Sequence, residues 1–136
     1  MRIAVLAAVC LAVPLASAGA EDIDGAAEFA ARCAVCHGDD GRGHGPYEMF
    51  LKIAPTDLTR LSAENRGEFP YRAVYKAIDG RAELLAHGPR EMPIWGYEYA
   101  RLALRDGEHA GDETPETVAA QKIRALVEHI RAMQAE

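Results

Sequence analysis

Two cysteines and a histidine in the segment Cys33-Ala34-Val35-Cys36-His37 constrain this chain more than any other feature. The spacing is that of a C-x-x-C-H haem-attachment motif, in which two thiols form thioethers with the two vinyl groups of one porphyrin. On a helical turn this spacing sets both sulfurs along one porphyrin edge, and the adjacent imidazole faces the iron. The motif therefore predicts one covalent haem c on Cys33 and Cys36, with His37 as an iron ligand.

Two other uses of this cysteine pair agree less well with the sequence. A disulfide of the thioredoxin type needs a βαβ context, and no alternating strand pattern persists along the chain. A structural zinc site normally takes four ligands, whereas no second cysteine pair follows His37 and the other histidines are scattered. Haem attachment is therefore the preferred interpretation.

Residues 1–20 predict a secretory signal peptide that is removed from the mature chain. Arg2 gives a basic start, residues 3–15 form an apolar run, and small residues then allow cleavage after Ala18 or Ala20. A membrane-spanning helix needs about 20 apolar residues, more than this run offers, so a retained anchor is the weaker explanation. We expect an exported protein, located in the periplasm of a bacterium.

The remaining residues, 21–136, are expected to form one domain, and Cys10 is lost with the signal. Val9 stands before Cys10 where bacterial lipoprotein signals carry a small residue, which argues against lipidation. Removal of the signal takes away the positive charge of Arg2. The remaining chain has 14 Lys and Arg against 21 Asp and Glu, a net charge of −7. An acidic chain disfavours nucleic acid as a partner and favours a protein with a basic docking face. No second apolar run is long enough to span a membrane.

Helix signals predict an all-α domain with long loops. Asp24 is a suitable N-cap for a short helix that runs into the cysteines. A second helix is expected over residues 71–79, with Gly80 as its stop, and a third from Pro115 to about Met133 after the N-cap Thr114. Loops this long in a small domain need a large buried group to organise them.

Several irregular segments separate these helices. The glycine-rich residues 38–46 predict a tight loop directly after the cysteine motif. Residues 54–59 are also irregular, and residues 87–96 predict a rigid loop without helical periodicity. Residues 106–113 form a polar, acidic loop.

The iron of an electron carrier usually takes a sixth ligand, and Met92 is the best candidate. It lies in the rigid loop, is followed by Pro93, and comes 55 residues after His37, enough chain to pass around a haem. Met49 follows His37 by only 12 residues, and Met133 falls on the last helix, where apolar packing explains it better. The histidines His44, His87, His109 and His129 are weaker candidates. Of these, His44 and His87 remain as the alternatives to Met92.

With these motifs the chain resembles the class I cytochrome c family in its small bacterial periplasmic form. The resemblance rests on Cys33-x-x-Cys36-His37, on Met92-Pro93 and on the terminal helices, and it spans nearly the whole mature chain. It implies helices wrapped around one haem, and outer-sphere electron transfer between a redox donor and an acceptor, without catalysis of a chemical reaction. The docking interfaces between such partners are small and transient.

Two further contacts are implied by the resemblance. In the family a carbonyl from a Gly-Pro segment accepts the Nδ1 hydrogen of the proximal histidine; Gly45-Pro46 matches here, so Pro46 is a predicted cofactor-binding residue. The family also crosses its first and last helices at a glycine and an aromatic residue. Gly25 and Phe29 match on the first helix and Leu126 on the last, where His129 replaces the usual aromatic.

Three functions follow from these features. The first is a periplasmic one-electron carrier with His37 and Met92 as axial ligands. The second is a haem-bearing electron-transfer subunit of a larger periplasmic oxidoreductase complex. The third, a haem sensor or peroxidase with an open iron site, is disfavoured because Met92 is placed to close that site.

Overall fold

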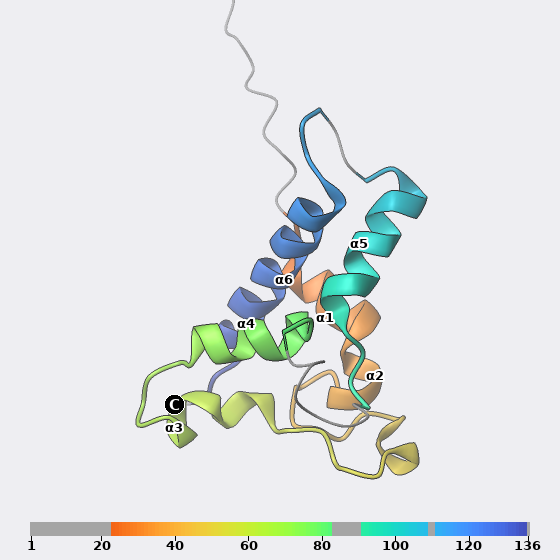
Figure 1. Ribbon diagram of the computed structural model, residues 1–136. Coiled ribbons are helices and arrows are strands. Elements are labelled where there is room, and N and C mark those ends of the chain that lie inside the picture. Colours follow the sequence, from red (N-terminus) through yellow and green to blue (C-terminus); the bar gives the residue numbers. More distant parts are fainter. Residues whose placement is uncertain (1–22, 83–90, 109–110, 136) are drawn as a thin grey trace, which may run out of the picture.

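The computed structural model describes residues 23–82, 91–108 and 111–135 (Figure 1). All regular structure within these ranges is helical, which confirms the predicted fold class. The predicted signal peptide and two candidate ligands, His87 and His109, lie outside the described residues. The elements are α1 (Gly25–Arg32), α2 (Ala34–His37), η1 (Glu48–Phe50), η2 (Leu58–Arg60), α3 (Leu61–Glu64), α4 (Tyr71–Asp79), α5 (Trp95–Asp106) and α6 (Pro115–Ala132).

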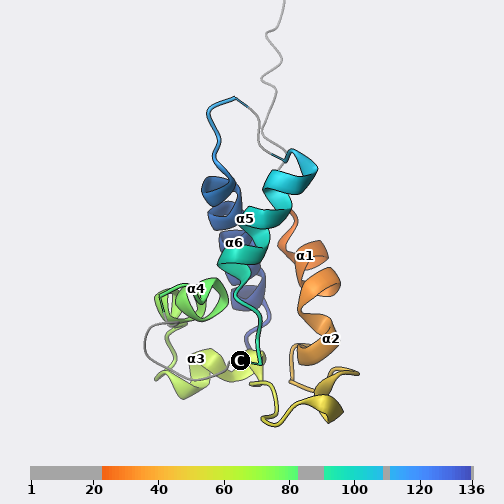
Figure 2. The same ribbon diagram turned by 45° about the vertical axis from the view of Figure 1, so that its right-hand side comes forward.

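The long helix α6 is the centre of the fold. It contacts α1, α4 and α5, and Figures 1 and 2 show α1 and α5 beside it, with α4 across its lower half. Its apolar face supplies much of the core. The largest fully buried side chains are Ile123, Leu126 and Val127 of α6 and Tyr99 of α5. None of the described helices has both the length and the apolar character that a membrane crossing requires.

The predicted helix ends are confirmed by the capping contacts. The Asp24 carboxylate accepts hydrogen bonds from the N–H groups of Ala26 (2.9 Å) and Ala27 (3.2 Å). Thr114 Oγ1 accepts from the N–H of Thr117 (3.2 Å), so α6 begins at Pro115 as expected. Gly80 ends α4 in the left-handed conformation, at φ 66°.

The crossing of α1 and α6 depends on a glycine and an aromatic pair, as the resemblance implied. A Cβ atom on Gly25 would lie 2.2 Å from the Ala125 carbonyl oxygen, so only glycine allows this approach. Four residues later on α1, the Phe29 ring packs on the His129 ring, with 5.2 Å between centroids. His129 therefore takes the place of the usual aromatic residue.

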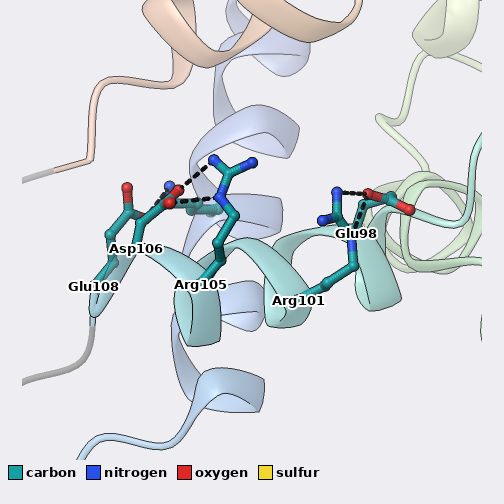
Figure 3. Close-up of polar contacts among 6 residues, drawn as sticks. Glu98, Arg101, Arg105, Asp106 and Glu108 are labelled. Atoms are coloured by element: carbon teal, nitrogen blue, oxygen red, sulfur yellow. Dashed lines mark hydrogen bonds and ion pairs between the residues drawn. The ribbon is translucent and has the colours of Figure 1, made fainter.

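Helix α5 was not predicted from the sequence. The rigid loop expected over residues 87–96 ends at Ile94, and the chain is helical from Trp95 to Asp106. The buried residues Tyr99, Leu102 and Ala103 have helical spacing. The outward face carries exposed ion pairs, Glu98 with Arg101 and Arg105 with Asp106 (Figure 3). Such exposed pairs contribute little to stability.

Candidate haem-attachment site

The C-x-x-C-H motif lies on a helical turn at the end of α1. Helix α1 ends at Arg32, and the Cys33 carbonyl accepts hydrogen bonds from the N–H groups of Cys36 (3.0 Å) and His37 (2.9 Å). Both cysteines are free thiols and partly buried. Burial, and then the charge of Glu28, raises the pKa of the Cys33 thiol to about 12, so this thiol is protonated at neutral pH.

The glycine-rich loop folds back onto this turn. The N–H groups of Gly43, Gly45 and Tyr47 donate to the carbonyls of His37 (2.7 Å), Cys36 (3.0 Å) and Val35 (2.9 Å) respectively. A Cβ on Gly45 would lie 2.5 Å from the Val35 carbonyl oxygen, so a side chain there would force the loop off the helix. The predicted tight loop is thus confirmed.

The His37 imidazole is oriented by a backbone carbonyl. Its Nδ1 lies 3.3 Å from the carbonyl oxygen of Thr56. When Nδ1 carries the proton and donates it to this carbonyl, Nε2 keeps its lone pair for a metal. Burial lowers the pKa of His37 below its ordinary value, and the hydrogen bond to Thr56 opposes this only in part. The ring is therefore neutral at pH 7, the form that binds iron.

The carbonyl that faces His37 is not the one we predicted. Gly45-Pro46 was expected to supply it, but Gly45 backs onto α2 and Pro46 lies exposed in the turn before η1. Thr56 reaches His37 because Gly43 has φ +89° and no Cβ: an added Cβ would lie 2.4 Å from the Pro55 carbonyl oxygen. A direct haem contact of Pro46 stays a prediction.

The segment that carries Thr56 is fixed at its far end. Asp57 is the N-cap of η2, and its carboxylate accepts hydrogen bonds from the N–H (2.9 Å) and the hydroxyl (2.7 Å) of Thr59. The Leu58 N–H donates to the Gly41 carbonyl (2.8 Å) in the glycine-rich loop. The Asp-x-Thr pattern is a capping signal, so the sequence itself indicates that this irregular segment is ordered.

Met92 lies at the edge of the core, where it is partly buried and packs against the core side chains. The other described candidates are placed differently. Met49 is 81% exposed, and Met133 packs on Gly41, where an added Cβ would lie 2.7 Å from its Cε. His44 is exposed and pairs with Glu48 at 3.2 Å. Met92 as the sixth ligand stays a prediction.

The residues of this site have the chemistry that a covalent haem requires. Two free thiols stand on one turn beside a neutral imidazole whose Nδ1 is already hydrogen-bonded. Partly exposed apolar side chains, the kind of lining that a porphyrin face needs, pack against the core: Leu58, Leu61, Phe69, Tyr71, Tyr75, Met92 and Trp95.

Comparison with known protein families identifies the chain. A family model described as cytochrome c matches residues 23–134. The chain belongs to the cytochrome c family. Neither a curated protein nor a solved structure gave a match. Membership of this family means electron transfer by a covalently attached c-type haem, with redox proteins as partners.

Proposed function

We propose that this cytochrome c is a periplasmic one-electron carrier. It holds one haem through Cys33 and Cys36, with His37 and Met92 as the axial ligands of the iron. The observation that carries the proposal is the Nδ1 contact of His37 with the Thr56 carbonyl, on the same turn as both thiols. A histidine fixed in this way is prepared to donate through Nε2.

Haem bound here would supply the redox chemistry through the ferric and ferrous states of its iron. The protein sets the conditions for this change. The Thr56 carbonyl fixes the His37 ring and raises its basicity, and the neutral Met92 thioether favours the ferrous state compared with a second histidine. The glycine-rich loop keeps the His37 side of the site closely packed.

The predicted location and partners complete the proposal. The signal peptide pattern of residues 1–20 supports export, with cleavage after Ala18 or Ala20. The acidic balance of residues 21–136 supports a donor and an acceptor with basic docking faces. Mass spectrometry of the periplasmic protein tests the export: the proposal expects a chain that begins at Gly19 or Glu21, and a full-length chain would contradict it.

The second candidate function, a haem-bearing subunit of a larger complex, is favoured by one observation. Apolar side chains on the segment after the motif are exposed to solvent: Tyr47 (49%), Met49 (81%), Phe50 (67%) and Ile53 (76%). Exposed apolar groups of this kind can mark a protein contact. Size-exclusion chromatography of the native extract separates the two functions, because a stable large complex would overturn the free carrier.

The electron-carrier proposal is tested by a redox titration of the purified protein. The expected result is one haem per chain, retained on the polypeptide after acid extraction and absent from a Cys33→Ala/Cys36→Ala variant. The haem should titrate as a single one-electron step. Extractable haem, more than one haem per chain, or a reduced protein that binds carbon monoxide rapidly would contradict the proposal.

A further inference from the structure

The Glu91 carboxylate bridges two parts of the chain that are far apart in the sequence. Its Oε1 accepts a hydrogen bond from the N–H of Lys52 at 2.8 Å, and its Oε2 accepts from the N–H of Ile53 at 3.0 Å. Both oxygens are thus used on two successive backbone N–H groups. Hydrogen bonds to an ionised carboxylate are about twice as strong as neutral ones.

The segment that Glu91 contacts is connected in turn to the cysteine motif. The Leu51 N–H donates to the Glu48 carbonyl (2.9 Å) at the end of η1. The Tyr47 N–H, at the start of η1, donates to the carbonyl of Val35 (2.9 Å), which lies between the two cysteines. The two Glu91 hydrogen bonds thus join the segment before α5 to the chain that follows η1. The Glu91 bridge therefore links the neighbour of Met92 to the haem-attachment turn.

We propose that Glu91 is a positioning residue for Met92: its bridge to Lys52 and Ile53 holds the Met92 thioether on the iron. The inference rests on the proposed function, because it requires Met92 to be the sixth ligand. Pro93 follows Met92 and has no N–H to donate, so the backbone here has fewer hydrogen bonds available to fix it. A side chain that ties this segment down compensates for that lack.

Loss of the bridge should free Met92 from the iron more often, while the helical core stays intact. An added ligand such as imidazole binds ferric iron only when Met92 is displaced, so its apparent affinity reports the fraction of displaced methionine. We expect Glu91→Ala to bind imidazole at least about tenfold more tightly than the wild type, because two charge-assisted hydrogen bonds are lost. Glu91→Gln keeps one acceptor oxygen and should fall between the two.

The experiment measures imidazole affinity of the oxidised holoprotein for the wild type, Glu91→Ala, Glu91→Gln, Met92→Ala and Glu128→Ala. Glu128 is an exposed glutamate on α6 that pairs with Arg131 at 3.8 Å, so its variant controls for the loss of a surface carboxylate. Urea unfolding followed by helical circular dichroism shows whether each variant is folded under the binding conditions. If Glu91→Ala does not fold, Glu91→Gln decides.

The outcomes separate the inference from the function on which it rests. In support, Met92→Ala loses the weak red charge-transfer band of methionine-ligated ferric haem, Glu91→Ala keeps the band but binds imidazole more tightly, and Glu128→Ala behaves as the wild type. If Met92→Ala loses the band while the Glu91 variants match the wild type, the positioning role is wrong and the ligand stands. If Met92→Ala keeps the band, the assigned ligand is itself wrong.

Discussion

The orientation of His37 depends on how closely one stretch of backbone passes another. The Thr56 carbonyl lies 3.3 Å from Nδ1, and the preceding peptide packs directly over Gly43. Gly43 contributes twice, through its positive φ and through the missing Cβ. The ligand geometry of a histidine is therefore set by a glycine six positions away that does not touch the ring.

Substitution of Gly43 tests this dependence. Gly43→Ala should displace Pro55 and with it the Thr56 carbonyl, because the new Cβ would lie 2.4 Å from the Pro55 oxygen. Weaker hydrogen bonding to Nδ1 makes His37 a poorer donor, so the reduction potential should rise. Spectroelectrochemical titration of the holoprotein measures this change.

Gly67→Ala is the matched control. Gly67 has φ +86° and nothing within 4 Å of an added Cβ, so its variant carries the same conformational cost, about 1–2 kcal/mol, without the steric contact. We expect Gly67→Ala to lower stability by that amount and to leave the potential unchanged. Equal potentials in both variants would show that the Thr56 contact does not depend on Gly43.

The spacing of the motif predicted that Cys33, Cys36 and His37 share one helical turn, and the structure confirms that turn. Cys33, Cys36 and His37 were assigned from local chemistry alone, because their spacing is meaningful only on one turn. The Gly-Pro resemblance assigned the partner of His37 to Gly45-Pro46, whereas in the structure the carbonyl of Thr56, which follows Pro55, faces the ring. Which of two such segments reaches the ring is decided by tertiary packing, which no local pattern records.

Among the helices, α1 and α6 cross closely at Gly25. A Cβ at Gly25 would lie 2.2 Å from the Ala125 carbonyl oxygen and 3.2 Å from the His129 Cβ. A carbonyl oxygen within a helix cannot move without disturbing that helix. The two helices would have to separate to admit even one methyl group.

We expect Gly25→Ala to lower the free energy of unfolding by about 1–3 kcal/mol, the usual cost of overpacking. The higher helix propensity of alanine is too small to offset this cost. Urea unfolding of the holoprotein measures it, with Ala30→Ser, an added atom at an exposed site of the same helix, as the control. A Gly25→Ala variant as stable as Ala30→Ser would contradict the close crossing.

Capping signals account for which helices could be predicted. Asp24, Thr114 and Gly80 marked the ends of α1, α6 and α4, and the structure confirms each. Helix α5 begins after Ile94 with no side-chain cap. Its start is fixed instead by contact with α4, since a Cβ on Gly96 would lie 2.3 Å from the Asp79 carboxylate. A helix whose start is fixed by a tertiary contact has no capping signal at that start.

At the scale of the molecule, a partly buried polar cluster joins α1, α5 and α6. The Tyr99 hydroxyl of α5 donates to the Glu28 carboxylate of α1 (3.0 Å), and Lys122 of α6 lies 3.4 Å from Glu28. Lys122 also pairs with Glu108 at 2.6 Å. Burial acts to lower the pKa of Lys122, but the hydrogen bond to Glu108 and the charge of Glu28 raise it overall.

This cluster predicts how stability changes with pH. Burial, and then the charge of Glu28, raises the pKa of Tyr99 above its ordinary value of 10.0. The unfolded chain releases the Tyr99 proton above pH 10, whereas the folded chain keeps it. The contribution of Tyr99 is therefore fully present below pH 10 and is lost above it, by up to about 1.4 kcal/mol per pH unit.

Tyr99→Phe removes the titrating group while keeping the ring in the core. Urea unfolding between pH 8 and pH 11 should show a smaller loss of stability for this variant than for the wild type. At pH 8 the variant should be less stable by about 1 kcal/mol, because the Glu28 hydrogen bond is missing. Parallel pH profiles for the two proteins would show that Tyr99 ionises equally in both states.

The absorption spectrum of the oxidised holoprotein tests the central claim, the His37/Met92 ligation of a covalent haem, most directly. The wild type should show the weak red charge-transfer band of methionine-ligated ferric haem. Met49→Leu and Met133→Leu should keep this band, because Met49 is exposed and Met133 packs on Gly41. Met92→Ala should lose it. A band that persists in Met92→Ala would contradict the account.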